Sequence, residues 1–244
     1  MYEQNNKPFI KLPNNTIWCA NNDEESLKIQ LGNYPFTMSS LIYLASNLTI
    51  KGYTVFSLKD MMLDCGYSIE KSKNVSNFKN FISGLVYLGV LEDIDEDIKK
   101  NDLVKSKLYL DTDKNFFKFY LEYFDIIMES EYSSPIKNNT ITVLCYILAT
   151  TNKKLECAFF SLDTVVIDLK ISKSTILKCI NILNELGIIY SDHIGSIGSV
   201  KTPNYYSTSL EGLYKGLKES YMNYKDIVGF LPNKNLLKHL DLDI

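Results

Sequence analysis

Arginine is missing from this chain of 244 residues, in which all 26 basic residues are lysines. The bidentate contacts that arginine makes with guanine or phosphate are therefore excluded, and any nucleic-acid recognition must use Lys, Asn, Ser and Thr. The 29 acidic residues leave a formal net charge of −3, so the molecule as a whole is not a polycation. Nucleic-acid binding would then require a local basic face.

Long apolar runs are also missing. Residues 1–12 are polar and contain no apolar core of a signal peptide, and charged residues interrupt the apolar stretches before they could span a membrane. The five cysteines are odd in number, widely spaced and free of CxxC pairs, and three of them lie in apolar helical patterns: Cys65, Cys145 and Cys179. We therefore expect a cytoplasmic protein with buried reduced thiols and no membrane association.

Sequence motifs typical of enzymes and metal sites are missing as well. The chain has no GxxxxGK[ST] loop, no GxGxxG, no GxSxG and no HExxH. Asp93, Asp95 and Asp97 form a D-x-D-x-D pattern, but Ile98 stands where a calcium loop requires glycine. We expect a protein that is not an enzyme and has no cofactor and no metal site.

The strongest positive signal is an internal repeat. One copy spans residues 56–91 and the other residues 160–189, and each begins with Phe-Ser-Leu and ends with Leu-Gly and two aliphatic residues. An apolar helix is expected before each copy, over residues 39–48 and 140–150. Three pairs of residues are expected to occupy matching core positions in the two copies: Phe56 and Phe160, Leu58 and Leu162, and Leu88 and Leu186.

Two further helices are expected within each copy. The serine of Phe-Ser-Leu, Ser57 or Ser161, can cap the first of them by accepting hydrogen bonds from backbone N–H groups. The second has a core face at helical spacing and ends at a glycine, Gly89 or Gly187. The core faces are Val75, Phe78, Ile82 and Leu85 in one copy and Ile176, Ile180, Leu183 and Leu186 in the other.

A two-stranded hairpin is expected after these helices. In the first copy residues 90–94 would pair with residues 107–111, and in the second residues 188–194 would pair with residues 205–208 across a Gly/Ser tip. Helix, helix, turn, helix and hairpin is the order of a winged helix-turn-helix. We predict an α+β, mainly α fold with two tandem winged helix-turn-helix modules, joined by a helix and followed by a C-terminal helical extension.

The predicted domain organisation has five segments: an N-terminal arm (residues 1–36), a first module (37–115), an aromatic-rich linking helix (116–136), a second module (137–209) and a helical extension (210–244). Within the arm, residues 9–12 can form an edge strand. The extension carries an apolar stripe at helical spacing, which must pack on the second module or pair with a second protomer. The stripe is Leu210, Leu213, Leu217, Tyr221 and Tyr224.

Lysine, serine and asparagine gather on the outer face of the last helix in each copy, where a recognition helix contacts DNA. The second module offers Lys170, Lys173, Ser174, Lys178, Asn181 and, on its wing, Lys201. The first module offers Lys73, Asn77 and Asn80. Residues 137–209 contain seven lysines and five acidic residues, whereas residues 1–115 contain 13 lysines and 15 acidic residues. The first wing is acidic and repels phosphates, so we expect the second module to supply most of the affinity.

The two copies, joined by a predicted helix, and the opening Phe9-Ile10-Lys11-Leu12-Pro13 resemble the tandem winged-helix replication initiators of bacterial plasmids and phages. That resemblance implies sequence-specific binding of double-stranded DNA by one module, while the other binds DNA or mediates dimerisation. A transcriptional regulator of the same fold and a winged-helix scaffold for protein–protein interaction remain alternatives. The partners to consider are therefore DNA, a second copy of the chain and a protein bound to the first module.

Overall fold

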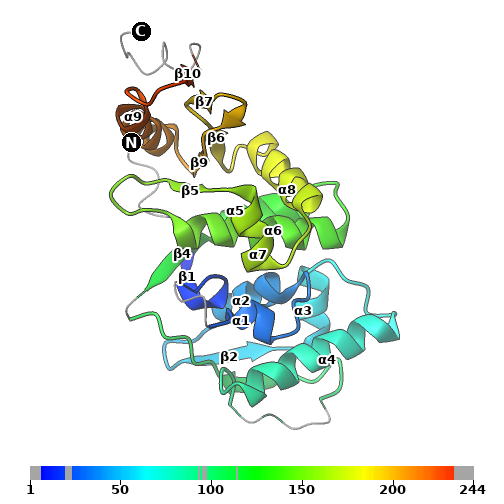
Figure 1. The fold of residues 1–244 in the computed structure, drawn as a ribbon. Coiled ribbons are helices and arrows are strands. Elements are labelled where there is room, and N and C mark those ends of the chain that lie inside the picture. The colour runs from blue at the N-terminus through cyan, green and yellow to red at the C-terminus, as the bar shows by residue number, and fades with distance from the viewer. Residues whose placement is uncertain (1–6, 20–23, 93, 95–97, 114, 234–244) are drawn as a thin grey trace. The chain divides into compact units, whose positions relative to one another are not determined.

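The computed structural model describes residues 7–19, 24–92, 94, 98–113 and 115–233. The chain divides into two compact units, Met1–Ala149 (unit 1) and Thr150–Ile244 (unit 2). Both are α+β, with helices and small antiparallel sheets (Figure 1).

Unit 1 is mainly helical in its described part. Its helices are a 3-10 turn η2 (Asn14–Thr16), α1 (Leu27–Gln30), α2 (Thr37–Ser46), α3 (Leu58–Asp64), α4 (Ser72–Tyr87), α5 (Leu121–Glu129) and α6 (Ser134–Thr150). Its strands are β1 (Phe9–Pro13), β2 (Tyr53–Phe56), β3 (Val104–Lys107) and β4 (Phe116–Tyr120). The helices expected before the first copy and within it correspond to α2, α3 and α4.

Local signals in the sequence set the ends of α3 and α4. The Asp60 N–H donates to Ser57 Oγ at 3.0 Å, and Ser57 Oγ–H donates to a carboxylate oxygen of Asp60 at 2.6 Å, which satisfies the start of α3. Gly89 follows α4 with φ +68°, a conformation in which other residues are strained. The expected cap and stop are confirmed.

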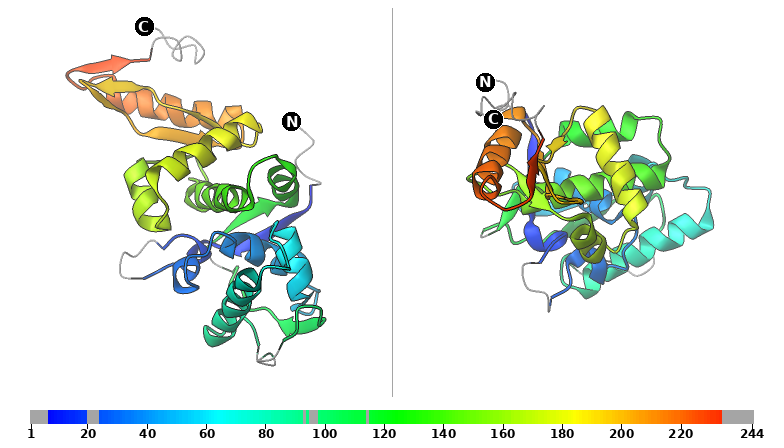
Figure 2. Two further views of the ribbon diagram at one scale, coloured as in Figure 1. Left: turned by 90° about the vertical axis from the view of Figure 1, so that its right-hand side faces the viewer. Right: turned by 45° about the horizontal axis from the view of Figure 1, so that its top comes forward.

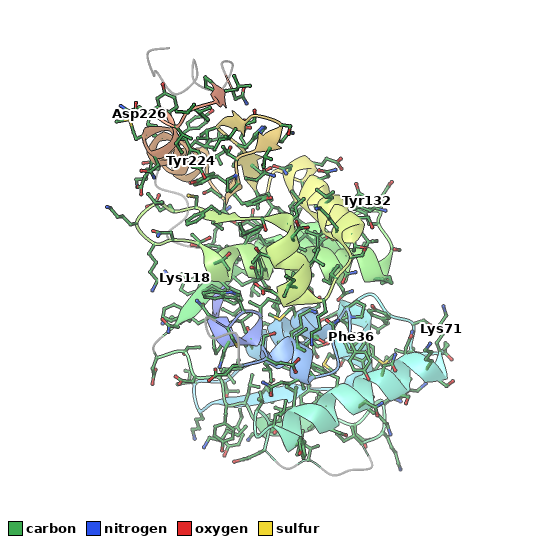
Figure 3. The ribbon with its side chains drawn as sticks, in the orientation of Figure 1. Phe36, Lys71, Lys118, Tyr132, Tyr224 and Asp226 are labelled. Atoms are coloured by element: carbon green, nitrogen blue, oxygen red, sulfur yellow. The ribbon has the colours of Figure 1, made fainter. Side chains whose placement is uncertain are left out.

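Aromatic rings fill the core of unit 1. Phe36 stacks on Phe78 of α4 with ring centroids 3.8 Å apart, and Phe81 meets Phe36 edge to face. Figure 3 shows Phe36 inside the unit. Buried aromatic pairs of this kind add to the stabilisation from buried area alone, so this cluster fixes α4 against the residues before α2.

The segment expected to link the two copies is not helical throughout. Residues 116–120 form strand β4, which pairs antiparallel with β1, Phe9 facing Tyr120. Burial alternates along β4, because Phe117 and Phe119 point into the core while Lys118 is exposed. The prediction of a helix over these residues is wrong, and helix α5 begins only at Leu121. The edge strand expected at residues 9–12 is confirmed as β1.

The hairpin expected in the first copy has a different partner. Strand β3 pairs with β2, with Val104 facing Phe56. Of the expected pairing between residues 90–94 and 107–111, the described residues keep an isolated bridge between Leu91 and Leu108. The partner differs because β2, the strand directly before α3, presents its backbone edge to β3. The hairpin pattern, which concerns segments that are neighbours in the sequence, does not reveal this pairing.

Every residue of helix α6 from Thr140 to Ile147 is buried. Its Asn138 side chain is buried, and the amide N–H donates to the Cys65 carbonyl at 2.8 Å and to the Ser134 carbonyl at 2.7 Å. The bond to Cys65 joins α6 to the end of α3 within unit 1, whereas the bond to Ser134 lies within α6. The boundary between the units, after Ala149, thus falls at the end of the helix that the sequence assigned to the second copy.

Unit 2 combines three helices with two small sheets in its described part. The helices are α7 (Leu162–Leu169), α8 (Lys173–Glu185) and α9 (Leu210–Tyr224). One sheet has the strand order β5 (Ala158–Phe160), β9 (Asn204–Ser207), β6 (Tyr190–Asp192), and the other the order β10 (Phe230–Pro232), β7 (Gly195–Ile197), β8 (Val200–Lys201). The strands expected within residues 188–194 and 205–208 are present as β6 and β9, and they pair.

The expected Gly/Ser tip is more ordered than a simple turn. Strands β7 and β8 pair through Ile197 and Val200, with Gly198 at φ +59° between them. Strand β10, near the end of the described chain, adds to the other side of β7 through Phe230. The tip is therefore a three-stranded sheet that includes residues about thirty positions later in the sequence.

The apolar stripe of the C-terminal extension packs inside unit 2. Leu213 and Leu217 of α9 are buried against Cys157, Ile194 and Tyr205, and Figures 1 and 2 show α9 lying along the strands β6 and β9. Of the two arrangements that the sequence left open for this stripe, the structure has the intramolecular one. Leu210, at the start of the stripe, is exposed.

Candidate nucleic-acid interface

Helices α7 and α8 are joined by a tight turn that both capping and backbone conformation define. Thr164 N–H donates to Ser161 Oγ at 3.1 Å at the start of α7, and Thr175 N–H donates to Ser172 Oγ at 3.3 Å at the start of α8. Lys170 ends α7 in the left-handed conformation, with φ +50° and ψ +39°. That conformation costs a residue other than glycine about 1–2 kcal/mol. The interactions of the neighbouring residues must therefore offset this cost and stabilise the turn.

Helix α8 presents two chemically distinct faces. Ile176, Cys179, Ile180 and Leu183 are buried, which confirms the expected core face apart from the half-buried Leu186. The opposite face carries the predicted DNA-binding residues of this helix, all exposed: Lys173, Ser174, Lys178 and Asn181. Lys170 is exposed in the turn before them. The structure thus brings five of the six candidates of the second copy onto one turn and one helix face.

An acidic residue that the sequence did not lead us to expect lies beside these lysines. Lys173 Nζ is 2.8 Å from Asp163 Oδ1 on α7, and both side chains are largely exposed. An exposed pair of this kind contributes about 0–1 kcal/mol. Asp163 therefore neutralises Lys173 at little cost to the fold, and a phosphate that approached Lys173 would meet this carboxylate.

Two exposed aliphatic side chains also belong to the surface of α7 and α8. Leu177 of α8 is 41% exposed and Ile167 of α7 is 73% exposed. Leu177 lies one turn from Lys173 and one turn from Asn181, so it shares the polar face. An apolar side chain there can contact the methyl group of thymine. The helical period of the sequence places Leu177 on this face, but the pattern of polar residues alone does not reveal it.

Lys201 stands apart from the α8 residues. It lies on β8, opposite Ser196 of β7, and is exposed. Strands β6 and β7 follow the end of α8 in the chain, whereas Lys173 and Ser174 occupy the first turn of that helix. Lys201 is thus an exposed lysine of the sheet formed by β10, β7 and β8, apart from the candidates on α8.

The candidates of the first copy lie on α4. Lys73 and Asn80 are exposed and Asn77 is half-buried, and their spacing places all three on one side of the helix. Lys71, the N-cap residue of α4, lies at the outer end of the helix (Figure 3). Tyr87, at the other end, is 90% exposed. This face contains more hydroxyl and amide groups than charges.

The loop after the first copy is described only in part. Asp93, Asp95 and Asp97, which form the D-x-D-x-D pattern, lie outside the described residues. Glu92 accepts a hydrogen bond from the Tyr109 hydroxyl at 2.9 Å, on the surface. Within the described ranges no group of three or more His, Cys, Asp or Glu side chains could hold a metal ion.

The thiols are poorly suited to nucleophilic chemistry. Cys65, Cys145, Cys157 and Cys179 are buried and reduced, as expected for the three in helical patterns. Burial raises the pKa of the Cys65 thiol to about 12 and that of the Cys157 thiol to about 11. Both thiols are therefore protonated at neutral pH.

No helix in the part of the chain that the structure describes combines the length and apolarity needed to cross a membrane. Neither a known protein family nor a curated protein matches this sequence.

Proposed function

We propose that this chain is a sequence-specific, double-stranded DNA-binding protein built from two tandem winged helix-turn-helix modules, with α8 as its main recognition helix. The observation that carries the proposal is the exposed polar face of α8, which follows a capped helix and a tight turn. Lys173, Ser174, Lys178 and Asn181 all project from this face. Helix α8 has 13 residues and is about 20 Å long, a length suited to the major groove.

Lysine, serine and asparagine supply complementary contacts on such a face. Ammonium groups contact phosphates and guanine, and an asparagine amide can bond adenine in a bidentate manner. Leu177 adds an apolar contact for thymine. The proposed class covers both a replication initiator of a plasmid or phage and a transcriptional regulator of the same fold, since both would use this surface in the same way.

The proposal is tested on a duplex selected by the protein from random DNA. We expect binding to weaken as salt rises, because each lysine that contacts a phosphate releases counterions. Replacing Lys173 and Lys178 together by Ala should weaken binding. It should also reduce the slope of log K against log salt by about 0.9 for each phosphate that is no longer neutralised. Fluorescence anisotropy at several salt concentrations measures both quantities.

Two matched pairs control for the loss of charge alone. Lys215→Ala with Lys218→Ala removes two exposed lysines from α9, and Lys71→Ala with Lys73→Ala removes two from the beginning of α4. Both pairs should change the affinity and the salt slope much less than the α8 pair. Equal effects for the α9 and α8 pairs would contradict a specific role for α8. A protein that selects no duplex at low salt would instead favour the protein-interaction scaffold.

A further inference from the structure

The sheet formed by β1 and β4 buries one face and leaves the other open to solvent. Leu12, Phe117 and Phe119 lie on the buried face. Because side chains alternate along paired strands, five other residues of the two strands share the opposite face, the β1–β4 face. They are Phe9, Lys11, Phe116, Lys118 and Tyr120. Solvated sheet faces are usually polar, so three aromatic rings beside two lysines make this one unusual.

The two lysines of the β1–β4 face lie directly opposite each other. Lys11 pairs with Lys118 in the antiparallel register, and both side chains are exposed; Figure 3 marks Lys118. Like charges in facing positions destabilise a sheet. Each ammonium lies over a ring of the other strand, Lys11 Nζ 4.6 Å from the centroid of Phe116 and Lys118 Nζ 4.7 Å from that of Phe9. These cation–π contacts hold two positive charges side by side.

Aromatic rings lie at both ends of the lysine pair. Phe9 is 41% exposed and meets Tyr120 edge to face, with ring centroids 6.0 Å apart. Phe116, at the other end, is half-buried. The two ends are four residues apart along the strands, or roughly 14 Å, so rings and charges form one continuous strip.

The sequence around the β1–β4 face is poor in acidic residues. Residues 7–19 and 115–121 contain no Asp or Glu. The acidic residues nearest to β4 in the sequence are Asp113 and Glu122, and a carboxylate oxygen of Glu122 lies 2.6 Å from Lys7 Nζ. The ion pair with Lys7 neutralises Glu122, so Lys11 and Lys118 make this face basic in a chain whose net charge is −3.

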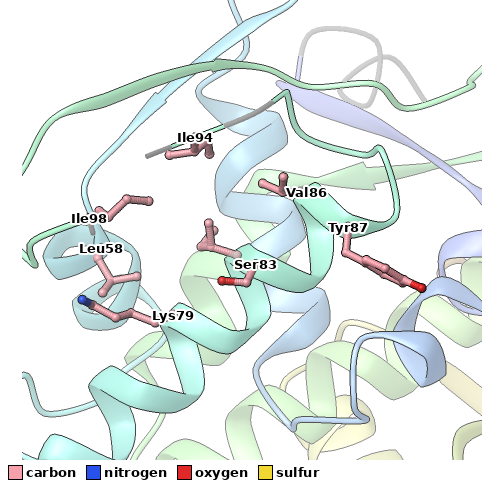
Figure 4. Close-up of a pocket in the computed structure, with 8 residues that line it drawn as sticks. Leu58, Lys79, Ser83, Val86, Tyr87, Ile94 and Ile98 are labelled. Carbon is pink, nitrogen blue, oxygen red and sulfur yellow. The ribbon is translucent and has the colours of Figure 1, made fainter. Parts of the chain in front are cut away.

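Two other surfaces of unit 1 lack this combination. A cavity of about 500 Å³ beside α4 has mainly aliphatic side chains in the described part of its wall, with Lys79 as the one charge there (Figure 4). The outer face of β2 and β3 also carries a lysine over a ring, Lys105 Nζ at 4.9 Å from the Tyr53 centroid. Glu92, bonded to the Tyr109 hydroxyl, places a carboxylate beside that face.

We propose that the β1–β4 face binds single-stranded nucleic acid, with phosphates at Lys11 and Lys118 and bases stacked on the rings beside them. Surfaces that bind single strands combine positive charge for the backbone with aromatic rings for the bases. Cation–π contacts at exposed sites are weak, so each ammonium can move from its ring to a phosphate when a base stacks there. The site shares no residue with α8 and stands independently of the proposed duplex binding.

Fluorescence anisotropy of the full chain with labelled decamers tests the proposal: dT10, rU10 and an abasic deoxyribose strand with the same phosphates. Binding of dT10 or rU10 is expected, and the tighter of the two identifies the preferred sugar. The abasic strand should bind at least about tenfold more weakly, because it has no bases to stack. Equal affinity for the abasic strand would overturn the proposal. Binding to phosphatidylserine vesicles without binding of either base-containing strand would also overturn it and assign the face to an anionic lipid surface.

Substitutions that keep the bulk of each side chain locate the site. Lys11→Met with Lys118→Met should weaken binding of the preferred decamer by about tenfold or more. It should also lower the slope of log K against log salt by about 0.7 for each phosphate that is no longer neutralised. Phe9→Leu should weaken binding by about fivefold or more, the contribution of one stacked base, whereas Phe9→Tyr should retain it.

Matched variants control for charge and for exposed rings elsewhere. Lys105→Met with Lys107→Met removes two lysines that also lie over tyrosine rings, and Tyr87→Leu removes a ring that is 90% exposed on α4. Neither variant should change binding of the decamer by more than about twofold, and circular dichroism confirms that each folds. Equal losses for the β3 and β1–β4 pairs, or a folded Phe9→Leu variant with unchanged affinity, would overturn the proposal. Loss of decamer binding in the α8 variant, Lys173→Ala with Lys178→Ala, would place the site on α8 instead.

Discussion

Helices α4 and α8 occupy the same place in the two copies of the repeat, yet they present different surfaces. The outer face of α8 gathers Lys173, Lys178 and Asn181, whereas the outer side of α4 is dominated by hydroxyl and amide groups and borders an apolar cavity. The inner faces are alike in character, since both are buried and apolar. Packing constrains the inner positions in both copies, while the outer positions are free to take up different tasks.

The matched leucines of the two Phe-Ser-Leu motifs test how far the two copies are equivalent. Leu58 is 1% exposed, but Leu162 is only half-buried. Leu58→Ala should lower the free energy of unfolding by about 2–5 kcal/mol, and Leu162→Ala by less than about 1.5 kcal/mol. Denaturant melts followed by circular dichroism measure both, and equal decreases would show that the two positions are equivalent after all.

One helical glycine in each unit tests how closely the helices pack. A Cβ on Gly216 of α9 would lie 2.2 Å from the Cys157 sulfur, whereas a Cβ on Gly84 of α4 would meet only the Leu31 side chain, at 3.1 Å. Gly216→Ala should therefore destabilise by about 1–3 kcal/mol through overpacking. Gly84→Ala should change stability by less than about 1 kcal/mol, because helix propensity offsets the contact. Thermal melts of the two variants measure these changes in stability. A Gly216→Ala variant as stable as the natural sequence would mean that α9 packs less tightly than described.

Asp163 limits the basic character of α8. Asp163→Asn keeps the shape of the side chain, removes a negative charge and releases Lys173 from its ion pair. We expect stability to change by less than about 0.5 kcal/mol and affinity for the selected duplex to rise up to about fivefold at low salt. Anisotropy titration measures the gain, which should disappear in the Lys173→Ala background. A gain that survives there would reflect a general change in charge.

Asp64, at the end of α3, makes the stability of unit 1 depend on pH. Burial, and then the carboxylates of Asp60 and Asp125, raise its pKa. The folded state therefore holds the proton more tightly than the unfolded chain. The contribution of protonated Asp64 to the free energy of unfolding is fully present below the pKa that Asp64 has in the unfolded chain. It is lost as pH rises through the pKa that Asp64 has in the folded state.

Asp64→Asn should consequently stabilise unit 1 relative to the natural sequence as pH rises above about 4, the usual aspartate value. The Asp64 carboxyl is only partly removed from solvent, and solvent screening limits the gain to less than about 0.5 kcal/mol. Denaturant melts at several pH values measure it, and Asp125→Asn should reproduce part of the gain. A gain that does not vary with pH would rule out titration of Asp64 as its source.

Signals that act within a few residues predicted the local structure well. Ser57, Ser161 and Ser172 cap α3, α7 and α8, and Gly89 and Gly187, which follow α4 and α8, have positive φ. Each of these features depends on a hydrogen bond or a backbone preference near the residue itself, so the sequence pattern contains the information.

Features that depend on distant partners were not predictable in this way. The aromatic pattern of residues 116–120 is compatible with either a helix or a strand. These residues form a strand because they pair with β1. The ion pair between Asp163 and Lys173 depends on the angle between two helices. The cavity beside α4 depends on where Ile94 and Ile98 meet that helix. Such relations emerge only from the assembled fold.

The pairing of β1 with β4 has a consequence for the order in which the protein folds during synthesis. Phe9 faces Tyr120, and Asn14 N–H donates to the Asn115 carbonyl at 2.9 Å, so the first strand pairs with residues more than one hundred positions later. Contacts at this separation form late, because the intervening loop must close first. On the ribosome the first strand leaves the exit tunnel long before its partner is made. The first strand therefore remains unpaired until β4 emerges, and the helices α5 and α6 of unit 1 emerge later still.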